Sequence, residues 1–125
     1  MRRSMSLFIV LLLAGCALFT QEHYAVFFQP QSAELDGQAR SVIASLAEKA
    51  KQRPGAIVTV SGFADPGGDV PDNFKLSALR ARAVSNALIA DGVPAARIRR
   101  QSEGGVDYAI DSQESRRVEI KLGMP

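Results

Sequence analysis

Apolar and polar positions along residues 24–122 repeat with two periods, one of about two residues and one between three and four. A period of two is typical of strands with one buried face, and a period near 3.6 is typical of amphipathic helices. Four segments are predicted as strands: Tyr24–Phe28, Ala56–Gly62, Ala96–Gly104 and Arg116–Leu122. β-Branched and aromatic residues, and turn residues at the boundaries such as Pro30, support these predictions.

A first helical pattern follows Ser32. Its apolar residues recur at spacings of three and four and form one stripe: Leu35, Ala39, Val42, Ile43, Leu46, Ala47 and Ala50. This spacing predicts an amphipathic helix with one face in the core. Pro54 and Gly55 end the pattern because proline cannot continue a helix and glycine favours a turn.

A second helical pattern precedes Gly92. Ser77 is the expected N-cap, because its hydroxyl can accept a hydrogen bond from a free amide of the first turn. Ala81, Val84 and Leu88 form the expected buried stripe, and Gly92 is the expected end.

The predicted order of elements is βαβαββ. Each of the first two connections contains a helix, as a crossover between parallel strands requires. We therefore expect an α+β two-layer sandwich, with two helices on one face of a four-stranded mixed sheet. A single domain over residues 24–122 accommodates all six elements.

The first fifteen residues have the features of a secretory signal peptide. Arg2 and Arg3 supply positive charge, Leu7–Leu13 is a short apolar run, and small residues precede Cys16. The apolar character extends only over Leu7–Phe19, which is shorter than the roughly 20 residues that a helix needs to cross a bilayer. Removal of this segment is therefore expected, rather than a permanent membrane span.

Cys16 is the only cysteine of the chain. The letters LAGC at residues 13–16 resemble the bacterial lipobox, which implies that Cys16 is acylated and becomes the first residue of the mature protein. Ala17 follows it, and by resemblance to lipoprotein sorting this implies the periplasmic face of the outer membrane. The alternative is a cysteine that is lost with the cleaved signal. Residues 16–23 are then a short linker between the anchor and the domain.

The formal net charge of +2 belongs to the signal segment. Without Arg2 and Arg3, the fifteen Lys and Arg residues fall to thirteen, which equals the thirteen Asp and Glu residues. A balanced chain lacks the basic surplus that binds a phosphate backbone, so nucleic acid is not an expected partner.

Asp65 follows the second predicted strand, and Arg80 lies near the predicted start of the second helix. A carboxylate, a guanidinium group and free helix amides together suit a ligand that carries an ammonium and a carboxylate on one carbon. The spacing alone favours an internal Asp65–Arg80 salt bridge that holds the loop, since ion pairs between a loop and a helix are common. If exposed, such a pair contributes only about 0–1 kcal/mol.

Four motifs occur in order: VSGFAD, NFKLSALRARAVSNAL, DGVPAARI and SRRVEI. Together they resemble the OmpA-like peptidoglycan-binding domain over about Tyr24 to Leu122. The resemblance implies that Asp65 and Arg80 bind the diaminopimelate of the cell-wall stem peptide. It also implies that Asn73 lines the same pocket and that Arg116 supports its rim.

Three positions depart from the family pattern. Phe63 stands where His or Tyr is common, Gln29 where an acidic residue is common, and Ser115 where Asn is usual before the Arg pair. These departures put the selectivity and affinity for the stem peptide in question, while Asp65, Asn73 and Arg80 keep the pattern.

The function implied by the resemblance is that of an outer-membrane lipoprotein which binds peptidoglycan noncovalently and tethers the outer membrane to the cell wall. The alternative is an interaction module of an envelope machine, such as a secretion, conjugation or Tol-Pal-like complex, which depends on protein partners.

Enzymatic, cofactor-dependent and metal-dependent functions are not expected. His23 is the only histidine, so no Ser- or Cys-based catalytic constellation is apparent. Asp65, Asp69 and Asp72 share one loop but lack the spacing of an EF-hand. The basic cluster of Arg97, Arg99 and Arg100 is expected to be a solvated strand edge.

Overall fold

The structure is a computed structural model that describes residues 21–66, 69–105 and 114–124. The elements are β1 (Glu22–Phe27), α1 (Gly37–Gln52), β2 (Ile57–Ala64), α2 (Val70–Ala90), the 3₁₀ turn η1 (Ala95–Arg97), β3 (Ile98–Gly105) and β4 (Arg117–Gly123). The predicted order βαβαββ is confirmed, and the strand boundaries differ from the predicted ones by at most two residues.

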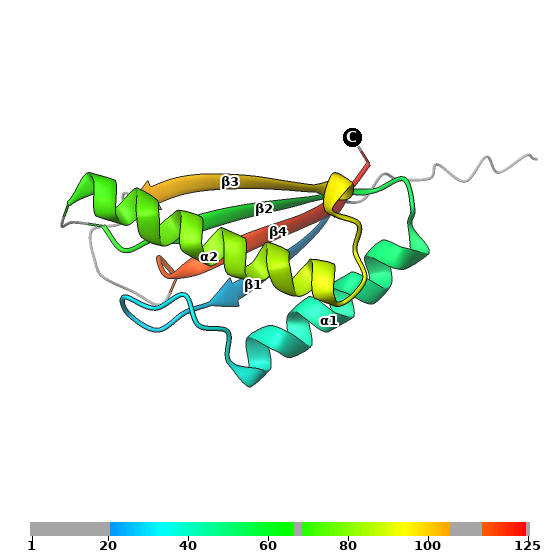
Figure 1. The fold of residues 1–125 in the computed structure, drawn as a ribbon, viewed down its shortest axis with the longest axis horizontal. Coiled ribbons are helices and arrows are strands. Elements are labelled where there is room, and N and C mark those ends of the chain that lie inside the picture. Colours follow the sequence, from blue (N-terminus) through cyan, green and yellow to red (C-terminus); the bar gives the residue numbers. More distant parts are fainter. Residues whose placement is uncertain (1–20, 67–68, 106–113, 125) are drawn as a thin grey trace, which may run out of the picture.

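The four strands form one mixed sheet in the order β1-β4-β2-β3. β4 lies antiparallel to both of its neighbours, and β2 pairs in parallel with β3. α2 is the crossover that parallel pairing of β2 and β3 requires. Figure 1 shows both helices on the same face of the sheet. The predicted α+β two-layer sandwich is therefore confirmed.

The core lies between this face and the two helices. Along β4, Val118, Ile120 and Leu122 are fully buried, and the residues between them point to the opposite face, because side chains alternate along a strand. Both predicted helical stripes are confirmed as core: Ala39, Ile43, Leu46, Ala47 and Ala50 from α1, with Ala81, Val84 and Leu88 from α2.

α1 begins at Gly37, so the expectation that it follows Ser32 is wrong. Asp36 is its N-cap, and its Oδ1 accepts a hydrogen bond of 2.7 Å from the amide of Ala39. The Ser32 hydroxyl instead accepts from the amide of Glu34. An aspartate four residues closer to the apolar stripe satisfies a free amide that Ser32 cannot reach.

α2 begins at Val70, so Ser77 is not its N-cap. Asp69 occupies the cap position and Pro71 lies in the first turn, where the missing proline N–H costs nothing. Ser77 lies inside the helix and is fully buried. Its hydroxyl donates to the carbonyl of Phe74 and accepts from the amide of Gly104, which joins α2 to β3. Arg80 therefore lies in the helix interior and not in its first turn.

The predicted end of α2 is confirmed: Gly92 follows the helix with φ of +105°, a conformation that favours glycine. The expectation for Arg97 is wrong. Its guanidinium donates to the carbonyls of Ala50, Arg53 and Ala56, so it caps the C-terminal end of α1 instead of facing solvent. Arg99 and Arg100 are exposed on the outermost strand, as predicted.

The sheet has two distinct ends. β1, β2 and β3 begin and β4 ends at one of them, which we call the entry end (Figure 1). The opposite end, where β4 begins, is the distal end. All the strands, both helices and the core lie within residues 21–124. Among the described residues, no helix combines the length and apolar character that a bilayer crossing needs.

Candidate functional site

Arg80 is the centre of a hydrogen-bonded cluster at the distal end of the sheet. It has no exposed surface. Its Nε donates to the carbonyl of Ser32 at 2.8 Å, Nη1 to that of Phe63 at 3.0 Å, and Nη2 to that of Gln29 at 3.2 Å. One side chain of α2 thus holds the end of β2 and the segment that follows β1.

The charge of Arg80 is placed in a desolvated environment. Burial lowers the pKa of Arg80, Asp65 opposes this by raising it, and the neighbouring Arg116 lowers it further. The guanidinium carbon lies 5.3 Å from the centre of the Phe28 ring, a cation–π arrangement. Three carbonyl oxygens and an aromatic ring therefore compensate for the water that the cation has lost.

Among the described residues, Asp65 forms a salt bridge with Arg116 and not with Arg80. The Asp65–Arg80 salt bridge that the spacing allows is therefore not observed. Nη1 of Arg116 lies 3.5 Å from each carboxylate oxygen of Asp65. Their side chains keep 18% and 15% of their surface exposed. Charge-assisted hydrogen bonds are usually about 2.7–2.9 Å long, so this pair is loose.

Arg116 also binds the end of β1. Its Nε donates to the carbonyl of Phe28, and its own carbonyl accepts from the amide of Phe28. Because Phe28 lies against Arg80, the residues Asp65, Arg80 and Arg116 form one cluster across β1, β2, α2 and the start of β4.

Asn73 joins the same region through Gly105. A side chain at Gly105 would meet the carbonyl oxygen of Asp65 at 3.0 Å and Nδ2 of Asn73 at 3.1 Å. The structure therefore brings all four predicted site residues of the folded domain together. Gly105 was missed by the sequence analysis, although the Gly104-Gly105 pair at the end of a predicted strand was a usable signal of close backbone approach.

Two of the three residues that depart from the family pattern, Phe63 and Gln29, contact Arg80 through their backbone carbonyls. These carbonyls accept hydrogen bonds from Arg80, and other side chains at the two positions would leave the same carbonyls in place. The Phe63 ring packs against Arg117, whose guanidinium carbon lies 4.1 Å from the ring centre. Ser115 is fully buried next to Arg116.

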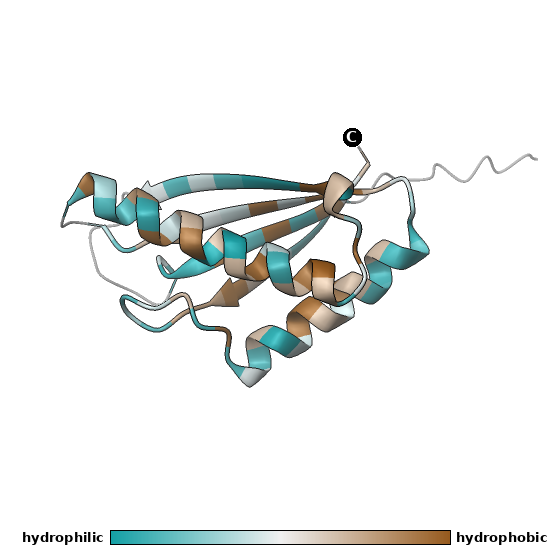
Figure 2. Cartoon of the chain, in the orientation of Figure 1, coloured by the Kyte–Doolittle hydropathy of each residue, from teal (hydrophilic) through white to brown (hydrophobic). Residues whose placement is uncertain are grey.

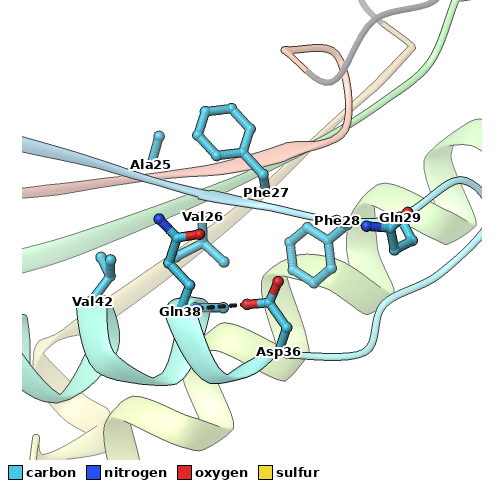
Figure 3. Close-up of a pocket in the computed structure, with 9 residues that line it drawn as sticks. Ala25, Val26, Phe27, Phe28, Gln29, Asp36, Gln38 and Val42 are labelled. Carbon is cyan, nitrogen blue, oxygen red and sulfur yellow. Dashed lines mark hydrogen bonds between the residues drawn. The ribbon is translucent and has the colours of Figure 1, made fainter.

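A separate small hollow of about 100 Å³ lies between β1 and the start of α1 (Figure 3). Val26, Phe28, Asp36 and Val42 are among its lining residues, and the Asp36 carboxylate is engaged with the amide of Ala39. None of the four site residues lines it. In the part of the chain that the structure describes, no three His, Cys, Asp or Glu side chains are grouped as a metal site would need.

The profile of the OmpA family matches residues 27–120. The chain belongs to the OmpA family. The match covers most of the folded domain, including β2, α2 and all four residues of the distal cluster.

Two curated relatives of this OmpA-family chain are named as lipoproteins. Probable lipoprotein YiaD of Escherichia coli is 36% identical over 103 residues, which cover 78% of this chain and 47% of that protein. Peptidoglycan-associated lipoprotein of Agrobacterium fabrum is 33% identical over 79 residues, which cover 63% of this chain and 45% of that protein. The chain thus spans less than half the length of these relatives.

Solved structures show the same fold. The OmpA-like domain of FopA1 from Francisella tularensis has a TM-score of 0.76 at 26% identity, with 84% of this chain and 73% of that chain covered. The peptidoglycan-associated lipoprotein of Burkholderia pseudomallei has a TM-score of 0.72 at 25% identity, with 78% and 88% covered.

The signal peptide over residues 1–15 and the acylation of Cys16 lie outside the described residues. Both stay predictions, as do the ligand roles of the four distal residues.

Proposed function

We propose that this OmpA-family chain is an outer-membrane lipoprotein which binds peptidoglycan noncovalently through the diaminopimelate of the stem peptide. Acyl chains on Cys16 hold one end in the inner leaflet of the outer membrane, and the distal cluster binds the cell wall. The proposed role is binding without catalysis.

The observation that carries this proposal is the loose, partly exposed pair of Asp65 and Arg116. The distal carbon of diaminopimelate bears an ammonium and a carboxylate. Asp65 can accept from the ammonium and Arg116 can donate to the carboxylate, so each end of the ligand forms a charge-assisted contact. Asn73, beside Asp65, adds an amide to the same rim.

Arg80 contributes from beneath this rim. Three of its five N–H groups are used by backbone carbonyls, and two remain. Its positive charge favours an anionic group at the rim, and its hydrogen bonds hold the segments that carry Asp65 and Phe28 in position. A ligand carboxylate that reaches the cluster meets a fixed cation and needs no reorganisation there.

The names of two relatives support the proposed lipid anchor and the proposed binding to peptidoglycan. One is called a probable lipoprotein and the other a peptidoglycan-associated lipoprotein. Acylation with more than one chain makes membrane anchoring stable. Anchoring in turn raises the local concentration of the domain near the wall to about the millimolar range, so modest affinity suffices for high occupancy.

The test is titration of the chain with two muropeptides that differ only at the third residue, diaminopimelate or lysine. Lysine lacks the distal carboxylate, so we expect it to bind at least about tenfold more weakly. Asp65→Asn keeps the shape of the side chain but removes its charge, and we expect a similar loss for the diaminopimelate ligand.

Asp69→Asn is the matched control, since Asp69 is exposed in the same region and makes no side-chain cap hydrogen bond. We expect its affinity to stay within about twofold of the wild type. Equal affinity of the wild type for both muropeptides, or equal losses in Asp65→Asn and Asp69→Asn, would contradict the proposal.

A second candidate function is an interaction module of an envelope machine. It is favoured by the exposed apolar residues Val70, Phe74 and Leu79 on the first half of α2, which are 64%, 47% and 53% exposed. Such patches often mark protein contacts. Leu79→Ser should then abolish recovery of a partner from cross-linked envelopes while leaving sacculus binding intact. If the chain only binds peptidoglycan, Leu79→Ser changes neither the recovery of a partner nor sacculus binding.

A further inference from the structure

One row of side chains crosses all four strands near the entry end. His23 of β1 pairs with Lys121 of β4, Lys121 pairs with Thr59 of β2, and Thr59 pairs with Arg99 of β3. Directly paired residues on neighbouring strands point to the same face. Because the next residues along β2 and β4 are core residues, this row points to the sheet face that the helices leave uncovered.

The row borders a hollow of about 250 Å³, and the described residues that line it include two cations and no Asp or Glu. Thr59, Arg99, Lys121 and Met124 are among the residues that line it. Neighbouring strands lie about 4.8 Å apart, so the backbones at Arg99 and Lys121 lie about 10 Å apart with Thr59 between them. Both side chains are long enough to converge on one phosphate group above Thr59.

The two cations of the row are available to a ligand. Among the described residues, neither Arg99 nor Lys121 forms an ion pair. Glu119, two residues before Lys121 on β4, pairs with Arg117, and Glu22 pairs with Lys49 and Arg53.

Glu22 is held by three hydrogen bonds: its Oε2 accepts from the Tyr24 hydroxyl and from Nζ of Lys49, and its Oε1 accepts from Nη2 of Arg53. The hydroxyl of Tyr24, followed by Lys49 and Arg53, lowers the pKa of this carboxyl. Within residues 21–66, 69–105 and 114–124, neither cation of the row is therefore paired with a carboxylate.

The position of the row relates it to the membrane. Gln21 also lines the hollow and follows Cys16 by five residues, which reach at most about 18 Å when extended. If Cys16 is acylated, as the proposed function requires, the entry end must stay close to the lipid headgroups. Figure 2 shows that α1 also ends in hydrophilic residues at this end, among them Lys49 and Lys51.

We propose that the entry end is a docking surface for anionic phospholipid headgroups. Arg99 and Lys121 bind the lipid phosphate, the Thr59 hydroxyl donates to it, and the exposed Met124 contacts the acyl boundary. Cationic side chains beside a short apolar contact are favoured at a negatively charged bilayer surface.

Docking fixes the orientation of the domain. β2 runs from the entry end to Ala64, next to Asp65, and eight residues of strand span about 26 Å. With the entry end on the headgroups, the distal cluster points away from the membrane toward the cell wall. This orientation rests on the proposed function, whereas lipid binding by the row does not.

The experiment uses the unacylated mature chain, residues 16–125 with Cys16→Ser, which contains the whole described fold. Its binding to vesicles is measured by flotation, with vesicles of phosphatidylcholine alone or with phosphatidylglycerol added. We expect binding to the anionic vesicles at about 50 mM salt and loss of binding at about 0.5 M salt, because salt screens these charges.

The decisive variant is the double charge reversal Arg99→Glu with Lys121→Glu. We expect it to bind anionic vesicles at least about tenfold more weakly. The matched control is Lys75→Glu with Arg82→Glu, which changes the net charge equally on exposed positions of α2. The control should stay within about twofold of the wild type, since its charges lie away from the row.

Three outcomes would overturn this inference: no binding of the wild type to anionic vesicles, equal binding to uncharged vesicles, or equal losses in both double variants. Free phosphate at millimolar concentration should not compete with the vesicles; if it releases the chain, the row binds phosphate and not a membrane.

Sacculus co-sedimentation separates this inference from the proposed function. The Arg99→Glu, Lys121→Glu variant should retain it, which also shows that the variant is folded. If that variant does not fold, Arg99→Gln with Lys121→Gln replaces it, and unchanged vesicle binding by this milder variant contradicts the inference.

Discussion

A buried arginine holds the distal end of the domain together. Arg80 is removed from water, and its charge is stabilised by three backbone carbonyls, an aromatic ring and a neighbouring carboxylate. Only a planar group with donors in several directions can reach three carbonyls that come from two different segments. The same residue that supports the proposed ligand site therefore also supports the fold.

Arg80→Lys should destabilise the protein by about 2–4 kcal/mol, because a lysine ammonium cannot reach all three carbonyls and leaves buried acceptors unpaired. The free energy of unfolding in urea measures this. Arg82→Lys, two residues along α2 and exposed, is the control and should stay within about 0.5 kcal/mol of the wild type. A loss below about 0.5 kcal/mol for Arg80→Lys would show that the three hydrogen bonds are not needed.

The resemblance predicted that four residues lie at one site, and the structure brings them together, but the sequence did not predict their arrangement. Asp65, Asn73, Arg80 and Arg116 meet at the distal end, yet the acid pairs with Arg116 and not with Arg80. The partners of Arg80 are backbone carbonyls, and every residue carries one. No pattern of side chains can therefore indicate that Ser32, Gln29 and Phe63 are the ones that accept.

At the scale of elements, both helices begin where an aspartate precedes them, at Asp36 and Asp69. The apolar stripes of both helices were predicted, because spacing at three and four residues follows from helix geometry. The start of α2 was not, because Pro71 was interpreted as part of the loop. Proline in a first turn is compatible with a helix, and this shifts Ser77 from the cap to the core.

Removal of the two caps should have different effects. Asp36→Ala should destabilise the protein by about 1 kcal/mol, because the amide of Ala39 loses its acceptor. Asp69→Ala should destabilise the protein by only about 0.3 kcal/mol, since Asp69 makes no side-chain hydrogen bond to the first turn of α2. Thermal unfolding of both variants measures the difference. Equal losses would mean that helix dipole interactions, which the two positions share, outweigh the cap hydrogen bond.

At the scale of the whole molecule, the two proposed binding surfaces lie at opposite ends of one rigid sheet. The loose Asp65–Arg116 pair is at the distal end, and the row of His23, Lys121, Thr59 and Arg99 is near the entry end. A domain attached at one end and binding at the other can bridge two surfaces without any change in its fold.

Cys16→Ser should separate the two attachments in cells. If the variant is exported, we expect it to leave the outer-membrane fraction and to co-sediment with purified sacculi as well as the wild type does. In the proposed function, anchoring depends on the acyl chains, whereas wall binding depends on the distal cluster. Membrane fractionation measures the first and sacculus sedimentation the second. A variant that stays in the membrane fraction would show that Cys16 is not the anchor.

The sequence by itself determined the elements, their order and the buried stripes, because these follow from local periodicity and from the backbone preferences of proline and glycine. It also indicated, through resemblance, which side chains form the site. Only the tertiary structure decided that Arg80 is buried beneath backbone carbonyls, that Asp65 pairs with Arg116, and that a basic row crosses four strands. These contacts join residues far apart in the chain, so local periodicity does not indicate them. The register between strands sets the basic row, and the packing of α2 on the sheet places Arg80.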